Sequence, residues 1–254
     1  MNKNDKLRHF EYFLEIQSCL QDCSSKIIEI YNKFDQSISY KKDNSPLTDA
    51  DLASNNLINK CLSSIASYPI ISEESDDFYT SENKYWLVDP LDGTKEFINK
   101  NGDFTINIAL IENQFPLVGY VYSPIKKTLY FGGLNKGSFK VFESNIEEIS
   151  VSKLHDPVRI IASRSHLNED TQKFISQFKN YELLQAGSSI KFCMVAEGSA
   201  DIYPRLAPTS EWDTAAAQAV VEGAGGSVQD LNNQRLKYQK KNILNPFFVV
   251  RGKE

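Results

Sequence analysis

Two aspartates near the middle of the chain constrain its fold and its chemistry more than any other feature. They lie in the stretch WLVDPLDGTKEF, which spans residues 86–97. The apolar residues 86–88 predict a buried strand. Because Pro90 favours an extended conformation for the residue before it, we expect this strand to end at Asp89.

A turn and a short helix are predicted to follow this strand. Gly93 permits a backbone conformation that other residues resist, and Thr94 is a natural cap for a helix that begins at Lys95. Asp89 and Asp92 then lie on one turn, beside the free N–H groups of a helix start. Carboxylates bind hard divalent cations and helix N-termini bind phosphate, so the stretch indicates a site for a metal ion and a phosphate. The alternative is an ordinary strand–turn–helix in which both aspartates only form the turn.

The composition places the chain in the ordinary soluble globular class. It has 254 residues, of which 41% are hydrophobic and 24% charged, enough for one large domain or two moderate ones. The net charge of −5 argues against nucleic acid as a partner held by bulk charge. A small phosphorylated substrate stays compatible with this charge, because metal ions supply positive charge locally.

We expect the chain to work in the cytoplasm. It has no run of about 18 apolar residues that could span a membrane, and its charged start lacks the apolar core of a signal peptide. The cysteines form no zinc-type double pair and the histidines are too scattered for a zinc centre; these residues are Cys19, Cys23, Cys61, Cys193, His9, His155 and His166.

The order of the predicted elements divides the chain into two halves, residues 1–154 and 155–254. In the first half, apolar residues at helical spacing predict a helix or helix pair over residues 7–34, and Thr48 caps a second helix that runs to about residue 65. Short strands separated by Gly, Pro and Asn follow, which is typical of a meander; they cover residues 68–72, 104–111, 117–122, 128–131, 138–142 and 149–151.

Helices and strands alternate in the second half, which predicts an α/β arrangement. The expected strands cover residues 158–162, 181–184, 201–203 and 246–250, and the expected helices cover 168–178, 188–197 and 214–222. The last helix is rich in alanine and ends in glycines, so we expect it to pack closely against a neighbour.

Four carboxylates lie at the predicted ends of strands or starts of helices; they belong to Glu73, Asp89, Asp92 and Asp213. Such ends can converge on one cleft, where α/β sheets usually bind ligands. Carboxylates crowded together without cations would be unfavourable, so convergence implies a metal ion, and hard oxygen ligands favour Mg²⁺. Taken singly, Glu73 could be a solvated loop residue and Asp213 a helix cap.

Four ordered motifs resemble those of the inositol monophosphatase superfamily, whose members are Mg²⁺-dependent, often Li⁺-sensitive phosphomonoesterases. The motifs are PLTDAD at residues 46–51, SEE at 72–74, DPLDGT at 89–94, and WD at 212–213 before the glycine-ended helix. The resemblance spans essentially the whole chain. It implies an α+β fold, the layered αβαβα sandwich of the inositol monophosphatase and fructose-1,6-bisphosphatase type, with a cleft between the two halves.

Further runs are similar to the CysQ-type bacterial 3′(2′),5′-bisphosphate nucleotidases of this superfamily. They are TKEF at residues 94–97, SRSH at 163–166, GSSIKFC at 187–193 and LNP at 244–246, whereas the run at 207–211 fits the family loosely. This resemblance implies removal of the 3′-phosphate of adenosine 3′,5′-bisphosphate, which leaves AMP and phosphate, in sulfur assimilation and nucleotide recycling. Relatives also suggest weak peripheral association with the inner face of the cell membrane, for which the sequence offers no support.

The resemblance implies a role for each matching residue. Two or three Mg²⁺ ions would be bound by Glu73, Asp89, the Leu91 carbonyl, Asp92 and Asp213. Asp51 and Thr94 would orient and deprotonate the attacking water. Glu74 would contact the metal ligands without binding the metal itself, or would hold a further ion through water.

Contacts with the substrate are implied for two groups of residues. The first group is Glu73, Leu91, Asp92, Gly93, Thr94 and Asp213, around the phosphate that is removed. The second is Arg164, His166, Ser188, Lys191 and Arg205, which offer charge and hydrogen bonds for a second phosphate and a base. Each of these cations could equally be an ordinary surface charge.

Two other functions stay open at this point. One is a phosphatase of the same fold that acts on inositol phosphate or another sugar phosphate. The other is a non-catalytic nucleotide sensor that keeps the Mg²⁺ cleft. The pair Asp51 and Thr94 argues against a sensor, because a sensor needs no activated water.

Overall fold

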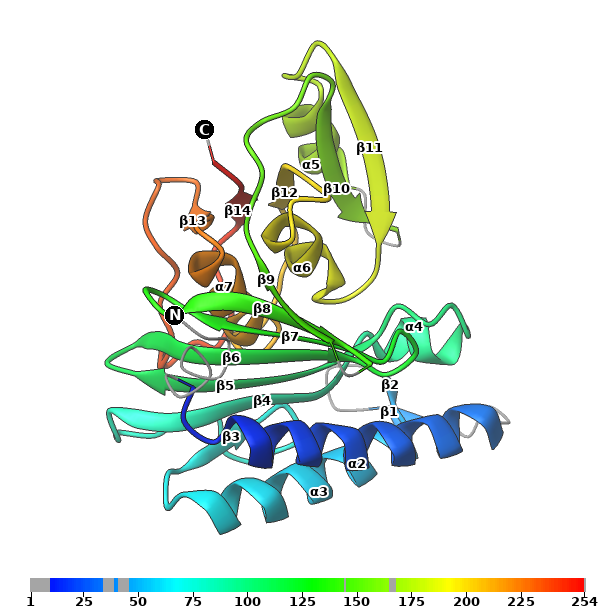
Figure 1. Cartoon of the computed structure of the whole chain (residues 1–254), viewed down its shortest axis with the longest axis vertical. Coiled ribbons are helices and arrows are strands. Elements are labelled where there is room, and N and C mark those ends of the chain that lie inside the picture. The colour runs from blue at the N-terminus through cyan, green and yellow to red at the C-terminus, as the bar shows by residue number, and fades with distance from the viewer. Residues whose placement is uncertain (1–9, 34–38, 41–45, 144, 165–167, 254) are drawn as a thin grey trace.

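The computed structural model describes residues 10–33, 39–40, 46–143, 145–164 and 168–253. They form five layers in the order helix, sheet, helix, sheet, helix, which confirms the predicted αβαβα sandwich (Figure 1). Among the described residues, no helix is both long and apolar enough to cross a membrane.

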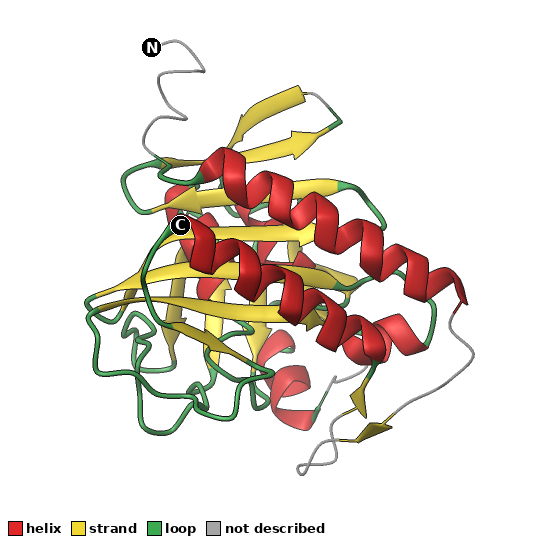
Figure 2. Ribbon diagram, turned by 90° about the horizontal axis from the view of Figure 1, so that it is seen from below, coloured by secondary structure: helices red, strands yellow, loops and turns green. Residues whose placement is uncertain are grey.

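The first layer is a pair of helices, α2 (Phe13–Lys33) and α3 (Asp49–Ile65), which lie side by side on one face of the larger sheet (Figure 2). The helix predicted over residues 7–34 is therefore confirmed for its central part, while residues 7–9 and 34 lie outside the described residues. Thr48 caps α3 as predicted, since its hydroxyl accepts a hydrogen bond from Ala50 N at 3.2 Å.

The second layer is a seven-stranded sheet whose strands lie in chain order. Its strands are β3 (Ile70–Ser72), β4 (Lys84–Asp92), β5 (Thr105–Glu112), β6 (Phe115–Ser123), β7 (Thr128–Gly133), β8 (Gly137–Phe142) and β9 (Asn145–Ile149). All neighbours are antiparallel except β3 and β4, so the predicted meander is confirmed. A two-stranded ribbon of β1 (Ser39–Tyr40) and β2 (Pro46–Leu47), not predicted, lies outside this sheet.

The end of β4 differs from the prediction. The strand does not end at Asp89 but runs to Asp92, where it pairs with Thr105. Asp89 pairs with Asn107, so three steps along β4 match two along β5, and one extra residue bulges at Pro90–Leu91. Because proline has no N–H to donate to a ladder, a bulge can accommodate it without ending the strand.

The short helix after this bulge is α4 (Thr94–Ile98). Its N-cap is Gly93, at φ +93°, and not Thr94 as predicted. The left-handed conformation that the turn requires is reached easily only by glycine, so the cap position moves to this residue. Thr94 is instead the first helical residue, and its hydroxyl is available for other contacts.

The second sheet has five strands in the order β11-β10-β12-β14-β13. They are β10 (Val158–Ser163), β11 (Tyr181–Ala186), β12 (Ile202–Arg205), β13 (Ser227–Asp230) and β14 (Phe248–Arg251), of which β13 was not predicted. Helix α5 (Glu169–Ile175) packs on its outer face, where Ile175 contacts Ile160 and Ala162 of β10.

Helices α6 (Ile190–Ala196) and α7 (Ala215–Gly223) fill the layer between the two sheets. The alanine-rich α7 packs so closely on β6 that a Cβ added to Gly119 would lie 2.1 Å from the Ala216 carbonyl oxygen. This confirms the close packing predicted for α7. Helix α6 begins two residues later than expected, because Ser188 adopts a positive φ of 46°.

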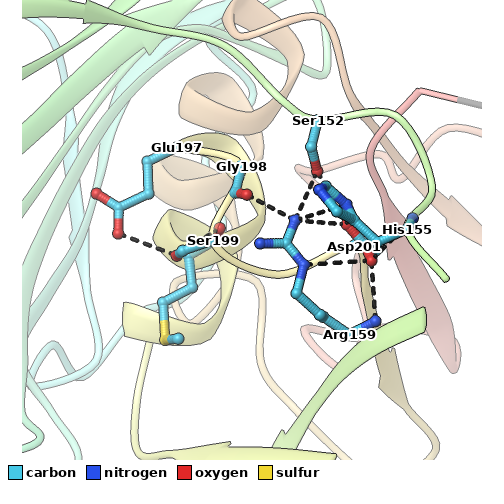
Figure 3. Close-up of polar contacts among 8 residues, drawn as sticks. Ser152, His155, Arg159, Glu197, Gly198, Ser199 and Asp201 are labelled. Atoms are coloured by element: carbon cyan, nitrogen blue, oxygen red, sulfur yellow. Dashed lines mark hydrogen bonds and ion pairs between the residues drawn. The ribbon is translucent and has the colours of Figure 1, made fainter. Parts of the chain in front are cut away.

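A buried carboxylate joins the second sheet to the segment that precedes it (Figure 3). Asp201 receives hydrogen bonds from the Arg159 guanidinium at 2.8 Å, from Ser152 Oγ at 2.9 Å, and contacts His155 Nδ1 at 2.9 Å. The Arg159 guanidinium also donates to the Gly198 carbonyl at 2.7 Å. The cluster therefore holds together two segments that are distant in sequence, residues 152–159 and 198–201.

Candidate active site

A cleft of about 350 Å³ opens where the end of β4 and helix α4 face the start of α6, the end of β12 and the loop before α7. Residues of both sheets line it. This confirms the expectation that the ends of several elements converge on one cleft.

Three of the predicted metal ligands meet in this cleft. Glu73, Asp89 and Asp213 each offer a carboxylate oxygen, and these oxygens lie within 4.8 Å of one another. Burial, followed by repulsion from neighbouring carboxylates, raises the pKa of both Asp89 and Asp213 well above the ordinary value. A divalent cation would remove this repulsion, and a set of hard oxygen donors fits such an ion.

Asp92 lines the same cleft but stands apart from this group of three. Its Oδ2 accepts hydrogen bonds from Ser189 N at 2.6 Å and from Ser189 Oγ at 2.9 Å. Leu91 lies between the two aspartates of the motif: its N–H donates to Asp89 Oδ1 at 3.1 Å, and its carbonyl oxygen lies 3.4 Å from Thr94 Oγ1. The bulge in β4 thus carries both aspartates and the Leu91 carbonyl to the cleft.

Asp51 and Thr94 are also brought together. Thr94 Oγ1 donates to Asp51 Oδ1 at 3.1 Å, while Asp51 Oδ2 accepts from the N–H and hydroxyl of Thr48 at 2.8 and 2.6 Å. Burial raises the pKa of Asp51 to about 6, although the hydrogen bonds from Thr48 and Thr94 lower it. Asp51 therefore has two roles, because it completes the cap of α3 and binds the threonine that lines the cleft.

The two adjacent glutamates differ in position. Glu73 lines the cleft, and its N–H donates to the Val88 carbonyl at 3.1 Å. Glu74 is not among the residues that line the cleft, and its N–H donates to Ser72 Oγ at 3.3 Å.

Only some of the residues predicted to recognise the substrate line the cleft. Ser188, Lys191 and Arg205 line the cleft with the carboxylates, and so does Gly93 of the turn. Arg164 does not line it; this half-exposed side chain pairs with Asp103 Oδ2 at 3.2 Å. His166 lies outside the described residues.

Lys191 is a buried cation at the cleft. Its ammonium group donates to the Ser188 carbonyl at 2.6 Å, and burial lowers its pKa to about 8. Arg205 donates to the Pro208 carbonyl at 3.1 Å, while its buried Nε has no partner among the described residues. Both side chains can therefore offer further N–H groups to an anion in the cleft.

Sequence reasoning missed Ser189, Asn107 and Asp103, which connect the two halves beside the cleft. Asn107 Nδ2 donates to Ser189 Oγ at 2.9 Å, and Asp103 Oδ2 accepts from Gly187 N at 3.1 Å. Ser189 belongs to the GSSIKFC run and could have been singled out there. Asn107 and Asp103 carry no local signal, because their partners are more than 80 residues away.

Comparison with known proteins identifies the family. The family model described as the inositol monophosphatase family matches residues 10–247. The chain belongs to this family. This match confirms the resemblance drawn from the four motifs. It also confirms that the chain shares the fold class of this family, whose members are metal-dependent phosphatases.

Individual relatives carry a more specific name. The 3′(2′),5′-bisphosphate nucleotidase CysQ of Buchnera aphidicola is 45% identical over 84% of this chain and 82% of its own length. That of Salmonella typhimurium is 41% identical over 83% of this chain and 87% of its own length. The crystal structure of CysQ from Bacteroides thetaiotaomicron, a bacterial member of the family, superposes with a TM-score of 0.82 at 39% identity, over 96% of this chain and 99% of that one.

Proposed function

We propose that this chain is a Mg²⁺-dependent 3′(2′),5′-bisphosphate nucleotidase that removes the 3′-phosphate of adenosine 3′,5′-bisphosphate and leaves AMP and phosphate. One observation carries the proposal: the carboxylates of Glu73, Asp89 and Asp213 share a cleft with the cations Lys191 and Arg205. Relatives that bear this enzyme name, at 41–45% identity over most of the chain, support the choice of substrate. Sulfur assimilation and nucleotide recycling are the proposed setting.

The proposed metal ligands are Glu73, Asp89, the Leu91 carbonyl, Asp92 and Asp213, for two or three Mg²⁺ ions. When bound, the metal supplies positive charge to the phosphate oxygens and lowers the pKa of a water molecule. Glu74, which does not line the cleft, is proposed to support these ligands or to hold a further ion through water.

Asp51 and Thr94 are the proposed catalytic pair. The Thr94 hydroxyl donates its proton to Asp51, so its lone pairs are left to accept a proton from a water that lines up with the phosphorus. A proton taken from the water can pass through Thr94 Oγ1 to Asp51 Oδ1. The backbone at Gly93 and Thr94 is proposed to hold the phosphate at the start of α4.

The second phosphate and the base are proposed to bind at the wall of the cleft that residues 155–254 provide. Lys191, Arg205 and Ser188 line that wall, and an anion near Lys191 would favour its charged form. Arg164 and His166 stay predictions, since Arg164 does not line the cleft and His166 lies outside the described residues. A phosphatase for a sugar phosphate is the second candidate, because its metal cleft would be the same.

Phosphate release by the purified protein tests the proposal. Adenosine 3′,5′-bisphosphate, inositol 1-phosphate and fructose 1,6-bisphosphate are compared with Mg²⁺, each with and without Li⁺. We expect a strong preference for the nucleotide and inhibition by Li⁺. Lys191→Met should raise KM for the nucleotide far more than KM for inositol 1-phosphate, whereas Lys173→Met, at an exposed position on α5, should change neither. Preference for a sugar phosphate would overturn the choice of substrate.

We also propose that the chain consists of two parts, residues 1–154 and 155–254. The larger sheet is built from residues 70–149 and the smaller one from residues 158–251, which supports a boundary near residue 154. The cytoplasm is the proposed compartment, since it suits a chain with four free cysteines.

A further inference from the structure

Ser189 occupies the N-cap position of α6 but does not cap this helix through its side chain. No side-chain hydrogen bond of the usual kind is formed to the first turn. A serine at this position normally accepts a hydrogen bond from the N–H two or three residues later. The hydroxyl of Ser189, which is 1% exposed, is therefore directed to other partners.

Those partners are ligand-bearing residues from both halves of the chain. Ser189 N and Oγ both donate to Asp92 Oδ2, at 2.6 and 2.9 Å, and Oγ lies 3.1 Å from the Asp213 carbonyl oxygen. Asn107 Nδ2 donates to Ser189 Oγ at 2.9 Å. Because the hydroxyl accepts from Asn107, its single proton is directed to Asp92 or Asp213, and the charged carboxylate is the stronger acceptor.

These contacts orient the Asp92 carboxylate. Every hydrogen bond found for the Asp92 carboxylate within the described residues goes to Oδ2; besides the two from Ser189, Thr105 and Asn107 donate at 3.4 Å. Within the same described residues no hydrogen bond to Oδ1 is found, so this oxygen can bind a cation. Hydrogen bonds of this kind would fix the orientation of a carboxylate that binds a metal.

We propose that Ser189 is a positioning residue of the metal site, which fixes the orientation of Asp92 and links it to the segment that carries Asp213. This inference rests on the proposed metal cleft and adds a residue to it. Asp92 comes from the first sheet and Asp213 from the loop before α7. A metal ion bound by both would therefore require these two segments to keep a fixed relative position. Ser189 fixes this relative position, because it contacts both Asp92 and Asp213.

Binding of Mn²⁺ without substrate tests the proposal. Free Mn²⁺ is measured by electron paramagnetic resonance for the wild type, Ser189→Ala, Ser189→Thr and Ser138→Ala. Ser138 is a matched control, since its buried hydroxyl donates to the Val220 carbonyl at 2.6 Å, away from the cleft. We expect Ser189→Ala to weaken the binding of one ion by about 10- to 100-fold, as for other residues that orient metal ligands. Ser189→Thr, which keeps the hydroxyl, should recover part of this loss.

A merely structural role predicts a different pattern. Ser189→Ala and Ser138→Ala would then lower the melting temperature alike and leave the Mn²⁺ affinities unchanged, which would overturn the proposal. If Ser189→Ala does not fold, Asn107→Ala can replace it, because it removes the donor to Ser189 Oγ. This variant should weaken the binding of the same Mn²⁺ ion. A wild type that binds no Mn²⁺ would overturn the metal cleft and the proposed function as well, whereas a normal wild type with an unaffected Ser189→Ala would overturn only this inference.

Discussion

Thr94 donates its hydroxyl proton to Asp51, with 3.1 Å between Thr94 Oγ1 and Asp51 Oδ1. The two residues come from different elements, since Thr94 begins α4 and Asp51 lies in the first turn of α3. The contact joins the helical layer to the end of β4, beside the group of three carboxylates. In the proposed mechanism, it is the route by which a proton leaves the cleft.

Replacement of Thr94 should lower kcat. Thr94→Ala removes the hydroxyl through which the proton passes, and we expect kcat to fall by about 100-fold or more, while Thr94→Ser should keep most of the activity. Initial rates at saturating Mg²⁺ and substrate measure this. Thr171→Ala is the control, because Thr171 is a buried threonine on α5 in the outer layer, and its kcat should equal that of the wild type. An unchanged kcat for Thr94→Ala would contradict the role of this hydroxyl.

Replacement of Asp89 should separate stability from metal binding. The raised pKa of Asp89 means that the metal-free folded state binds a proton more tightly than the unfolded chain does, so its stability falls as the pH rises above about 4. Asn cannot ionise, and metal-free Asp89→Asn should unfold at a higher temperature than the metal-free wild type at pH 7.5. Mg²⁺ should then raise the melting temperature of the wild type only.

Thermal unfolding in EDTA and over a series of Mg²⁺ concentrations checks both parts of this prediction. Asp170→Asn, at an exposed position on α5, should behave as the wild type in both conditions. A melting temperature of Asp89→Asn that rises with Mg²⁺ as in the wild type would rule out Asp89 as a ligand.

The Asp201 cluster should make stability depend on pH at the acidic end. Although burial alone would raise it, hydrogen bonds from Arg159, Ser152 and His155 hold the pKa of Asp201 well below its usual range. The ionised Asp201 carboxylate therefore contributes fully to the free energy of unfolding above the pKa of the unfolded chain, which is about 3.9. This contribution is lost as the pH falls through the lower pKa of the folded state. Asp201→Asn should cost about 2 kcal/mol at pH 7, because Arg159 is left partly buried without its partner.

Urea unfolding of the wild type and Asp201→Asn measures this difference at several pH values. The difference should be constant between pH 8 and 5 and should narrow below about pH 4. Glu29→Gln is the control, since Glu29 pairs with Lys26 and Lys33 on the exposed face of α2, and no change is expected at neutral pH. An equal difference at pH 7 and 3.5 would show that Asp201 contributes by packing and not by charge.

A methyl group at Gly119 should destabilise the fold. The Cβ of Gly119→Ala would overlap the Ala216 carbonyl, so β6 and α7 must move apart, which should lower the free energy of unfolding by about 2–3 kcal/mol. Ser123→Ala on the same strand is the control; its buried hydroxyl has no partner among the described residues, and its loss should be neutral or slightly stabilising. Chemical unfolding compares the two, and equal stabilities would contradict the close contact.

Several elements could be predicted from the sequence because their signals are local. Thr48 and Asp51 are three residues apart and cap the helix that they begin, and the glycine-rich and asparagine-rich turns of the meander identify themselves within a few residues. The turn at residues 89–94 was recognised for the same reason. Its exact course was not, because the bulge at Pro90–Leu91 depends on pairing with β5, which lies more than ten residues away.

The sequence by itself determined which residue types are available: carboxylates at the ends of elements, a threonine at a helix start, and the motifs of a metal-dependent phosphatase family. Only the tertiary structure decided which of them meet. It brought Lys191 and Arg205 to the cleft and paired Arg164 with Asp103, and it directed Ser189 to Asp92. Side chains far apart in sequence come together through the packing of whole layers, and that packing depends on the summed burial of many apolar residues and on no single motif.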